Sequence, residues 1–241
     1  MLDLQNLFKR REQAGSIFEL YVPSLDVKPG QLVTLVGDSG CGKSTLLDIL
    51  ALVMQPSQAD TFTLCFGGPD SPVVDVLGAW RASMEAELAR LRREHMGYIL
   101  QTGGLLPFLT VGDNLCLPAR IKGLQDPADH VLSLAKRLGI AQCLKRKPRA
   151  LSIGQRQRAA IVRAMAHKPD LVLADEPTAS VDKARAEQII QDLQAVTREQ
   201  KTAVVLVTHD PDLVTDADAT YGFDLDQTAD GEVQARCRRV A

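Results

Sequence analysis

The chain has 241 residues, a formal net charge of −2 at pH 7, 45% hydrophobic residues and 24% charged residues. Its length supports one large domain, or one domain with an inserted lobe, and its mild acidity argues against a general nucleic-acid binder, which is usually basic. No apolar run approaches the ~18 residues that a bilayer-spanning helix needs, and the first residues lack the pattern of a signal peptide. The five cysteines show no C-x-x-C spacing, which gives no sign of a zinc site or a disulfide framework. We therefore expect a cytoplasmic protein that reaches a membrane only through a partner.

The first thirty residues predict short β segments. Ile17–Val22 is rich in β-branched and aromatic residues, and Pro23 and Pro29 interrupt the run. We expect an antiparallel flap that leads into a central strand over Leu32–Val36, which is mostly apolar and therefore predicted to be buried.

The segment after this strand fits the G-x-x-x-x-G-K-[ST] pattern of a phosphate-binding loop, and a predicted helix over 44–52 follows it. Glycines let backbone N–H groups point at phosphate oxygens, and the positive end of the helix attracts the same anion. We expect Lys43 to reach the β- and γ-phosphates and the Ser44 hydroxyl to hold Mg²⁺. The predicted nucleotide-binding residues of the loop are Gly37, Asp38, Ser39, Gly40, Cys41, Gly42, Lys43, Ser44 and Thr45. Cys41 is either a point where thiol reagents block binding or, as we favour, a small residue that fits the loop.

The middle of the chain predicts a strand over 61–66, a helical stretch over 79–94 whose apolar stripe is typical of packing, and a short strand that ends at Gln101. The connection 102–110 is unusually apolar, which indicates either a binding surface or a loop tucked into the core. Residues 111–168 predict an inserted helical lobe. Its helices are expected over 111–117, 128–145 and 155–167.

Strand patterns resume at 171–174 and 203–207, with a helix over 183–198 between them and a short helix and strand over 211–225. The last fifteen residues are polar, so we expect them to be peripheral. Strands that alternate with helices predict an α/β fold with a mostly parallel sheet.

Ligands in such sheets bind beyond the carboxyl ends of the strands. Gly37, Gln101, Asp175 with Glu176, and His209 each come at or just after a predicted strand end, so we expect them to meet at one rim. Asp175 is placed to hold Mg²⁺, and Glu176 is placed to act as general base toward water. The alternatives are that the Asp-Glu pair caps the next helix and that His209 is a surface cap.

Residues 151–158, L-S-I-G-Q-R-Q-R, resemble the L-S-G-G-Q signature of ATP-binding-cassette (ABC) ATPases. The phosphate loop, Gln101, Asp175-Glu176, Ser180-Val181-Asp182 and His209 stand in that family's order, so the resemblance covers nearly the whole chain. It implies a P-loop ABC fold in one domain over 1–241. A RecA-like core with the β flap would occupy about 1–101 and 169–225, and a helical signature subdomain about 102–168.

The resemblance also implies roles for individual residues. Gln101 matches the glutamine that senses Mg²⁺ and links the core to the helical lobe, Asp182 matches an aspartate that communicates across a dimer, and His209 matches the histidine that contacts the γ-phosphate. The signature clamps the γ-phosphate bound by the other subunit, which implies a head-to-tail homodimer closed by ATP. The implied catalytic residues are Glu176, His209 and Lys43, the metal ligands Ser44, Gln101 and Asp175, the signature contacts Ser152, Gly154 and Gln155, and the cofactors ATP and Mg²⁺.

The chain departs from the family pattern at two places. Ile153 replaces the first glycine of the signature, and we expect activity to persist if the phosphate contacts come from Ser152 and the Gly154 backbone. The family usually places an aromatic residue upstream of the phosphate loop to stack on adenine, and here that position falls near Arg10 or Arg11, whose guanidinium plane can also stack. The other candidates are Phe8 and Tyr21.

Residues 97–101, followed by L-L-P-F-L-T-V over 105–111, resemble the lipoprotein-release, macrolide-export and cell-division branch of the family. This implies the ATPase subunit of a bacterial ABC transporter, peripheral on the inner face of the cytoplasmic membrane. Its permease partner would dock a coupling helix on the apolar loop and the helical lobe. No nucleic-acid partner is expected.

Two alternatives stay open. One is a non-transporting ABC ATPase that signals to or remodels a membrane complex. It would be distinguished from a transporter subunit by whether the membrane partner has a path for a substrate. The other is a soluble ABC ATPase acting on DNA or ribosomes, which the single cassette and the lack of a long heptad run disfavour.

Overall fold

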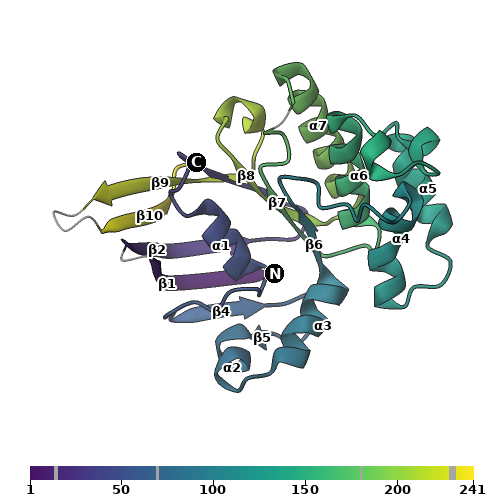
Figure 1. Ribbon diagram of the computed structural model, residues 1–241. Helices are drawn as coiled ribbons and strands as arrows, with labels where there is room; N and C mark the ends of the chain where they lie inside the picture. The colour runs from purple at the N-terminus through teal and green to yellow at the C-terminus, as the bar shows by residue number, and fades with distance from the viewer. Residues whose placement is uncertain (14–15, 69–70, 180, 228–231) are drawn as a thin grey trace.

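One curled, mixed sheet organises the molecule (Figure 1). The computed structural model describes residues 1–13, 16–68, 71–179, 181–227 and 232–241, and within this part ten strands pair in the order β5-β4-β1-β2-β10-β9-β3-β8-β7-β6. The strands are β1 Leu2–Gln13, β2 Ser16–Val27, β3 Leu32–Val36, β4 Thr61–Leu64, β5 Val74–Asp75, β6 Met96–Ile99, β7 Leu171–Asp175, β8 Ala203–Thr208, β9 Ala219–Gln227 and β10 Val233–Arg239. The five strands from β9 to β6 run parallel, and β5, β4, β1 and β2 pair antiparallel. The predicted α/β fold, with a parallel centre and an N-terminal antiparallel flap, is confirmed.

Helices cover the two faces of the parallel strands and form a group at one end of the molecule (Figure 1). They are α1 Lys43–Leu50, α2 Val76–Arg81, α3 Glu85–His95, α4 Val111–Lys122, α5 Ala128–Arg137, α6 Ile153–Met165 and α7 Lys183–Gln200, with 3₁₀ turns at Ala141–Cys143, Pro148–Ala150 and Pro211–Val214. Among the described residues, no helix is both long enough and apolar enough to cross a bilayer.

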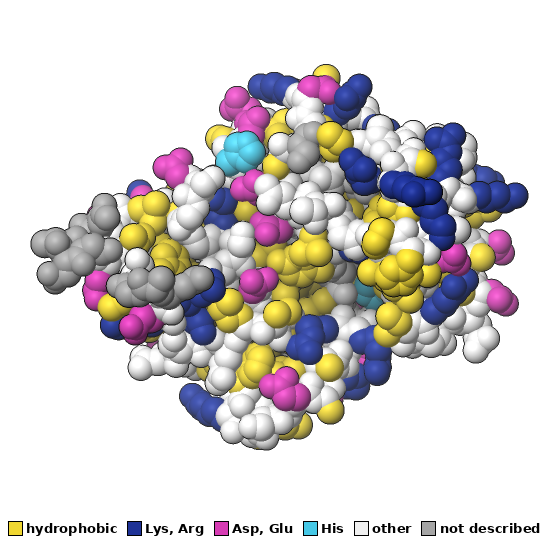
Figure 2. All heavy atoms as spheres, viewed as in Figure 1, with side chains coloured by type: hydrophobic (Ala, Val, Ile, Leu, Met, Phe, Trp, Pro, Cys, Tyr) yellow, Lys and Arg dark blue, Asp and Glu magenta, His cyan; other side chains and the backbone are white. Residues whose placement is uncertain are grey.

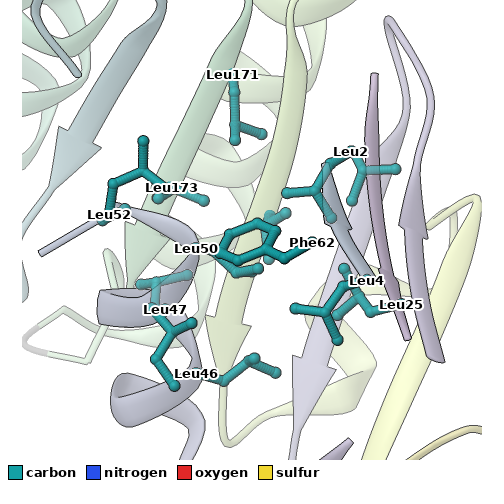
Figure 3. Close-up of a cluster of buried hydrophobic side chains, with 14 of the residues drawn as sticks. Leu2, Leu4, Leu25, Leu46, Leu47, Leu50, Leu52, Phe62, Leu171 and Leu173 are labelled. Carbon is teal, nitrogen blue, oxygen red and sulfur yellow. The ribbon is translucent and has the colours of Figure 1, made fainter. Parts of the chain in front are cut away.

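Strand β7 shows how the sheet separates two cores. Successive side chains of a strand point to opposite faces, so Leu171 and Leu173 join one buried cluster, while Val172 and Ala174 join the other. Figure 3 shows the first cluster, in which Leu171 and Leu173 lie near leucines of α1 and near Phe62 of β4. The second cluster contains the apolar faces of α4, α5, α6 and α7. At β7 the sheet is therefore buried on both faces, as parallel strands require.

The apolar loop before α4 is fixed by the buried side chain of Asn114. Its amide oxygen accepts from the Leu106 N–H at 2.7 Å, and its amide nitrogen donates to the carbonyls of Leu106 and Thr110 at 3.0 and 2.9 Å. Leu105 packs on the core, but Phe108 is 70% exposed. Both expectations for this loop are thus partly met, because one end of it is packed and its tip is open.

The last residues of the chain are not peripheral, which corrects the prediction from their polarity. Strand β10 pairs with β9 on one side and with β2 on the other. Every second residue points inward, and Ala235 and Cys237 are buried. The prediction was wrong because the exposed arginines of β10 make the segment polar in composition although its alternate residues are buried.

Several element boundaries also differ from the predictions. The helical stretch 79–94 is broken between α2 and α3, where Ser83 has φ +53°. The helix expected over 128–145 ends at Arg137, just before Gly139 (φ +64°). The flap strands are long rather than short: β2 continues through Pro23, which is tolerated because β10 pairs only with Phe18–Tyr21.

Candidate active site

Side chains that follow four parallel strands meet at one rim of the sheet, as predicted. The phosphate loop follows β3, Gln101 follows β6, Asp175 and Glu176 end β7, and His209 follows β8. A cavity of about 650 Å³ opens there. It is lined by Arg11, Ser16, Phe18, Ser39, Gly40, Gly42, Lys43, Ser44, Thr45, Gln101, Asp175 and Glu176.

Two features shape the phosphate loop. Gly42 has φ +98°, and a Cβ atom there would lie 2.8 Å from Phe18 Cζ, so only glycine fits. Lys43 is 4% exposed, and its Nζ donates to the carbonyls of Gly37 and Asp38, both at 2.7 Å. The lysine thus braces the loop with its charge next to the cavity. Cys41 is fully buried, as expected of a small residue that fits the loop.

Ser44 and Asp175, two of the residues predicted to bind the metal, contact each other. The Ser44 hydroxyl donates to Asp175 Oδ1 at 3.2 Å. Burial, together with the nearby carboxylates of Glu176 and Asp48, raises the pKa of Asp175 against the opposing effect of the Ser44 hydrogen bond. A hydroxyl and a carboxylate beside a phosphate site are the oxygen ligands that Mg²⁺ prefers, and a cation would relieve the crowded negative charge. The donor set fits Mg²⁺.

Glu176 is held between the two other predicted residues of the rim. Its Oε2 accepts from Gln101 Nε2 at 3.3 Å and lies 3.6 Å from His209 Nδ1. Its backbone has φ +43°, a left-handed conformation that is costly for a residue other than glycine and that clusters at functional sites. The Glu176 N–H donates to Val207 O on β8, which fixes this conformation.

The alternative capping interpretations are wrong. Helix α7 is capped by Asp182, whose side chain accepts from the Arg185 N–H at 3.1 Å, so Asp175 and Glu176 are not its cap. The 3₁₀ turn after His209 is capped by Asp210. Asp182 is exposed at the start of α7, and its neighbour Ser180 lies outside the described residues.

The signature residues begin α6 and stay outside the cavity. Ser152 and Gln155 form a reciprocal capping box, and none of Ser152, Gly154 and Gln155 lines the cavity. Gly154 has nothing within 4 Å of the position of a Cβ atom. Ile153 occupies the first helical position with its side chain 46% exposed. Ser152 and Ile153 at this helix N-terminus are therefore exposed.

Helix α6 is tied to the segment that carries Gln101. Gln157 Nε2 donates to the Gln101 carbonyl at 2.9 Å, and Arg163 donates to the Gly104 carbonyl. Gln157 is buried, so this contact is shielded from water. Two hydrogen bonds thus join the segment of Gln101 to α6.

The β hairpin resolves which residues reach the far end of the cavity. Arg10 points to the other face and pairs with Glu19 at 3.1 Å, whereas Arg11 lines the cavity. Tyr21 is engaged elsewhere, by Asn6 at its hydroxyl and by Arg236 over its ring, and Phe8 does not line the cavity. Sequence reasoning missed Phe18, which lies directly opposite Arg11 across the hairpin. Only the strand register could have revealed it.

Asp175→Asn is expected to raise the melting temperature of the nucleotide-free protein at pH 7. The folded-state pKa of Asp175 is raised, so its ionised form costs stability once the pH exceeds that pKa. The gain from asparagine should shrink as the pH falls through the folded-state pKa, and it should vanish below ~3, where the carboxyl is protonated in both states. Thermal melts of this variant and of Asp216→Asn, an exposed control, across this range test the prediction. An equal shift in both variants, or one that does not depend on pH, would contradict it.

Comparison with known proteins places this geometry in a family. Residues 20–179 match the family model described as "ABC transporter". The chain is 33% identical over 216 residues to the ABC transporter ATP-binding protein YxdL of Bacillus subtilis, covering 88% of this chain and 78% of that protein. It is 33% identical over 217 residues to the lipoprotein-releasing system ATP-binding protein LolD of Legionella pneumophila, covering 87% and 88%.

A third relative is longer than this chain. The macrolide export ATP-binding/permease protein MacB of Marinobacter nauticus is 38% identical over 202 residues, which cover 81% of this chain but only 29% of MacB. Among solved structures, a dimer of the ATP-binding cassette MJ0796 in a post-hydrolysis state with ADP and Pi aligns with a TM-score of 0.75 at 30% identity, over 100% of this chain and 99% of that one. The chain therefore belongs to the ABC transporter family, as an ATP-binding cassette that is an ATPase.

Proposed function

We propose that this chain is the ATP-hydrolysing subunit of a transporter, in which two copies close head to tail around two ATP molecules and drive a separate membrane permease. The observation that carries the proposal is the meeting of Lys43, Ser44, Gln101, Asp175 and Glu176 around one cavity. These groups supply phosphate binding, metal binding and a general base in one place.

Each residue around the phosphates has a distinct task. The loop N–H groups and the start of α1 hold the phosphate oxygens, and Lys43 turns from its two carbonyls toward the β- and γ-phosphates. Ser44, Asp175 and the amide oxygen of Gln101 would hold Mg²⁺, since the Gln101 amide nitrogen donates to Glu176. When bound, the ion neutralises charge on the β- and γ-phosphate oxygens.

Hydrolysis then depends on Glu176 and His209. Glu176 accepts a proton from a water molecule as the water oxygen bonds to the γ-phosphorus and the bond to the β–γ bridging oxygen breaks. His209, 3.6 Å from the Glu176 carboxylate, orients that water and contacts the γ-phosphate. The Gln101 hydrogen bond orients the Glu176 carboxylate.

The second copy completes the site. At the start of α6 the Gln155 N–H donates to the Ser152 hydroxyl and the Arg156 N–H to the Ser152 carbonyl, and within the described part of the chain the N–H groups of Ile153 and Gly154 have no such partner. Such an end binds anions, and here Ile153 is exposed and the signature residues do not line the cavity of their own chain. The MJ0796 cassettes are dimeric, which supports a dimer of this chain.

The permease is proposed to dock beside α6. A cavity of about 380 Å³ is lined there by Val53, Leu100, Met96, Arg92 and Arg163, among others, and Val53 and Leu100 are 63% and 44% exposed. Figure 2 shows hydrophobic side chains gathered near the centre of the view and over the helical group to its right. Arg92 and Arg163 are hydrogen-bonded to backbone carbonyls rather than to carboxylates. An amphipathic helix with apolar residues and an acidic group complements this surface. Docking there would place the protein on the inner face of the cytoplasmic membrane.

A pull-down with the Glu176→Gln variant tests this function. The tagged variant is used to extract membranes in mild detergent with ATP and Mg²⁺, and a stoichiometric integral membrane protein is expected. Adding Val53→Glu should release that protein, whereas Val240→Glu, an exposed control near the C-terminus, should not. If a soluble protein or nucleic acid co-purifies instead, the membrane role is wrong, but the ATPase activity is not contradicted. A membrane partner that has no path for a transported substrate would favour the non-transporting alternative.

A further inference from the structure

Positive charge is concentrated in one part of this chain. Residues 102–168 contain twelve lysines and arginines, three aspartates and no glutamate, which is a formal charge of +9, whereas the whole chain has a charge of −2. The rest of the molecule is therefore strongly acidic, at −11. Such an asymmetry is typical of proteins that bind an anionic surface. The densest run of cations is K-R-K-P-R over 145–149, shortly before the signature.

The segment 145–149 is a fixed part of the surface rather than a tail. The Arg146 carbonyl accepts from the Val111 N–H at 2.8 Å, which joins the segment to the first turn of α4. Pro148 is buried and anchors the segment from within. The four basic side chains around it are all exposed: Lys145, Arg146, Lys147 and Arg149. A folded backbone thus presents four cations to solvent together.

Most of this charge is not neutralised within the molecule. In the part of the chain that the structure describes, the side chains of Lys145, Arg146 and Arg149 form no hydrogen bond or ion pair. The acidic residue at the start of α4, Asp113, pairs with Arg120 at 3.6 Å. The cations of the segment are therefore available to anions outside the chain.

An exposed aromatic residue lies beside these cations. Lys147 Nζ donates to the Phe108 carbonyl at 2.7 Å, and the Phe108 side chain is 70% exposed at the tip of the loop before α4. Asn114 fixes the backbone of this loop through three hydrogen bonds, so the ring is presented by an ordered support. Figure 2 shows Lys and Arg side chains around the hydrophobic side chains of the helical group at the right of the view.

We propose that Phe108 and the basic side chains of 145–149 bind directly to a bilayer that contains anionic phospholipids. The cations contact the headgroup phosphates, and the ring enters the boundary between headgroups and acyl chains. The same membrane repels the acidic remainder of the molecule, which turns the helical group toward it. A nucleic acid fits this surface less well, because a single exposed ring does not form a row of stacking platforms.

This contact goes beyond the proposed function and is independent of it. Phe108 does not line the cavity proposed for the permease, and neither Phe108 nor the segment 145–149 lines the nucleotide cavity. The bilayer contact therefore needs neither a permease nor ATP, and it is measurable with the purified chain and protein-free vesicles.

Co-sedimentation with vesicles of defined composition tests the proposal. The intact chain is expected to bind vesicles of equimolar phosphatidylglycerol and phosphatidylcholine at low salt, and not to bind vesicles of phosphatidylcholine alone. Binding should be lost at 1 M salt, where screening reduces the Debye length to about 3 Å. Equal binding to both kinds of vesicle, or binding that does not depend on salt, would overturn the proposal.

Variants assign the binding to this surface. Removing two cations in Lys145→Gln/Arg146→Gln should weaken binding about 25-fold, because each basic side chain near an anionic surface contributes about fivefold. Phe108→Ala should weaken it about tenfold through the lost apolar burial. Lys28→Gln/Arg198→Gln removes the same two charges at exposed positions outside residues 102–168 and should bind like the unaltered chain. All three variants should keep the melting temperature and the ATP dissociation constant.

Three results would contradict the bilayer contact. An equal loss in the control pair would show that net charge matters and this surface does not. Full vesicle binding by Phe108→Ala would show that the ring stays outside the bilayer. If the intact chain binds a double-stranded oligonucleotide through Lys145 and Arg146 but no anionic vesicle, the surface serves a nucleic acid. Each of these results leaves the proposed ATPase and permease roles untouched, because neither ATP nor a permease is present in the assay.

Discussion

Replacing Glu176 with glutamine is expected to lower ATP turnover by about 10²- to 10⁴-fold while ATP still binds. Glutamine keeps the shape of the side chain and can still accept from Gln101 through its amide oxygen, but it cannot take a proton from water. Steady-state phosphate release and nucleotide binding measured on the same preparation check both parts.

The same variant is expected to accumulate as an ATP-bound dimer. Binding closes the two copies and the missing base prevents the reaction that releases them, so the equilibrium shifts toward the closed state. Size-exclusion chromatography with light scattering, with and without ATP, measures this shift. Glu85→Gln, an exposed control on α3, should behave like the unaltered chain. Normal turnover in Glu176→Gln would show that the general base lies elsewhere.

Replacing Lys43 with alanine is expected to weaken ATP binding by at least about 30-fold, which corresponds to ~2 kcal/mol lost with a charge-assisted contact in a buried setting. Lys43 is almost fully buried beside the cavity, so little water screens its interaction with phosphate. Unlike Glu176→Gln, this variant should fail at binding and therefore should not form the ATP-dependent dimer. Isothermal titration with ATP and Mg²⁺ gives the dissociation constant.

Two further measurements make the Lys43 result interpretable. The carbonyls of Gly37 and Asp38 lose their donor in this variant, so a thermal melt must show that it is folded. Lys136→Ala, an exposed control on α5, should bind ATP normally. A dissociation constant within threefold of the unaltered chain in a folded Lys43→Ala protein would exclude the lysine from the phosphate site.

The parts of the site that could be predicted from the sequence are those whose chemistry is local. The phosphate loop is nine consecutive residues between a buried strand and a helix, and the residues after β6, β7 and β8 could be placed because parallel strands end at one edge. In the structure Ser44 contacts Asp175, and Glu176 contacts Gln101 and His209, as expected of residues at the ends of neighbouring parallel strands. Capping of α7 and of the turn after His209 by other residues removed the alternatives.

Other features depended on contacts between distant residues, and the sequence pattern did not reveal them. The C-terminal residues looked peripheral because β10 alternates small inward residues with arginines, and its burial depends on the partners β2 and β9. Whether Arg10 or Arg11 lines the cavity depends on which face of β1 turns toward it. A helical periodicity over 79–94 likewise could not show the break at Ser83.

The sequence by itself determined the family and the α/β order of elements, and it predicted the phosphate, metal and general-base residues, because each of these depends on short runs whose physical requirements are local. Only the tertiary structure decided that Phe18 faces Arg11 beside Gly42, that Gln157 and Arg163 bind the segment of Gln101, and that the last strand lies inside the sheet. The physical reason is that strand register and helix docking are set by the burial of surfaces far apart in the chain, which a single sequence does not pair.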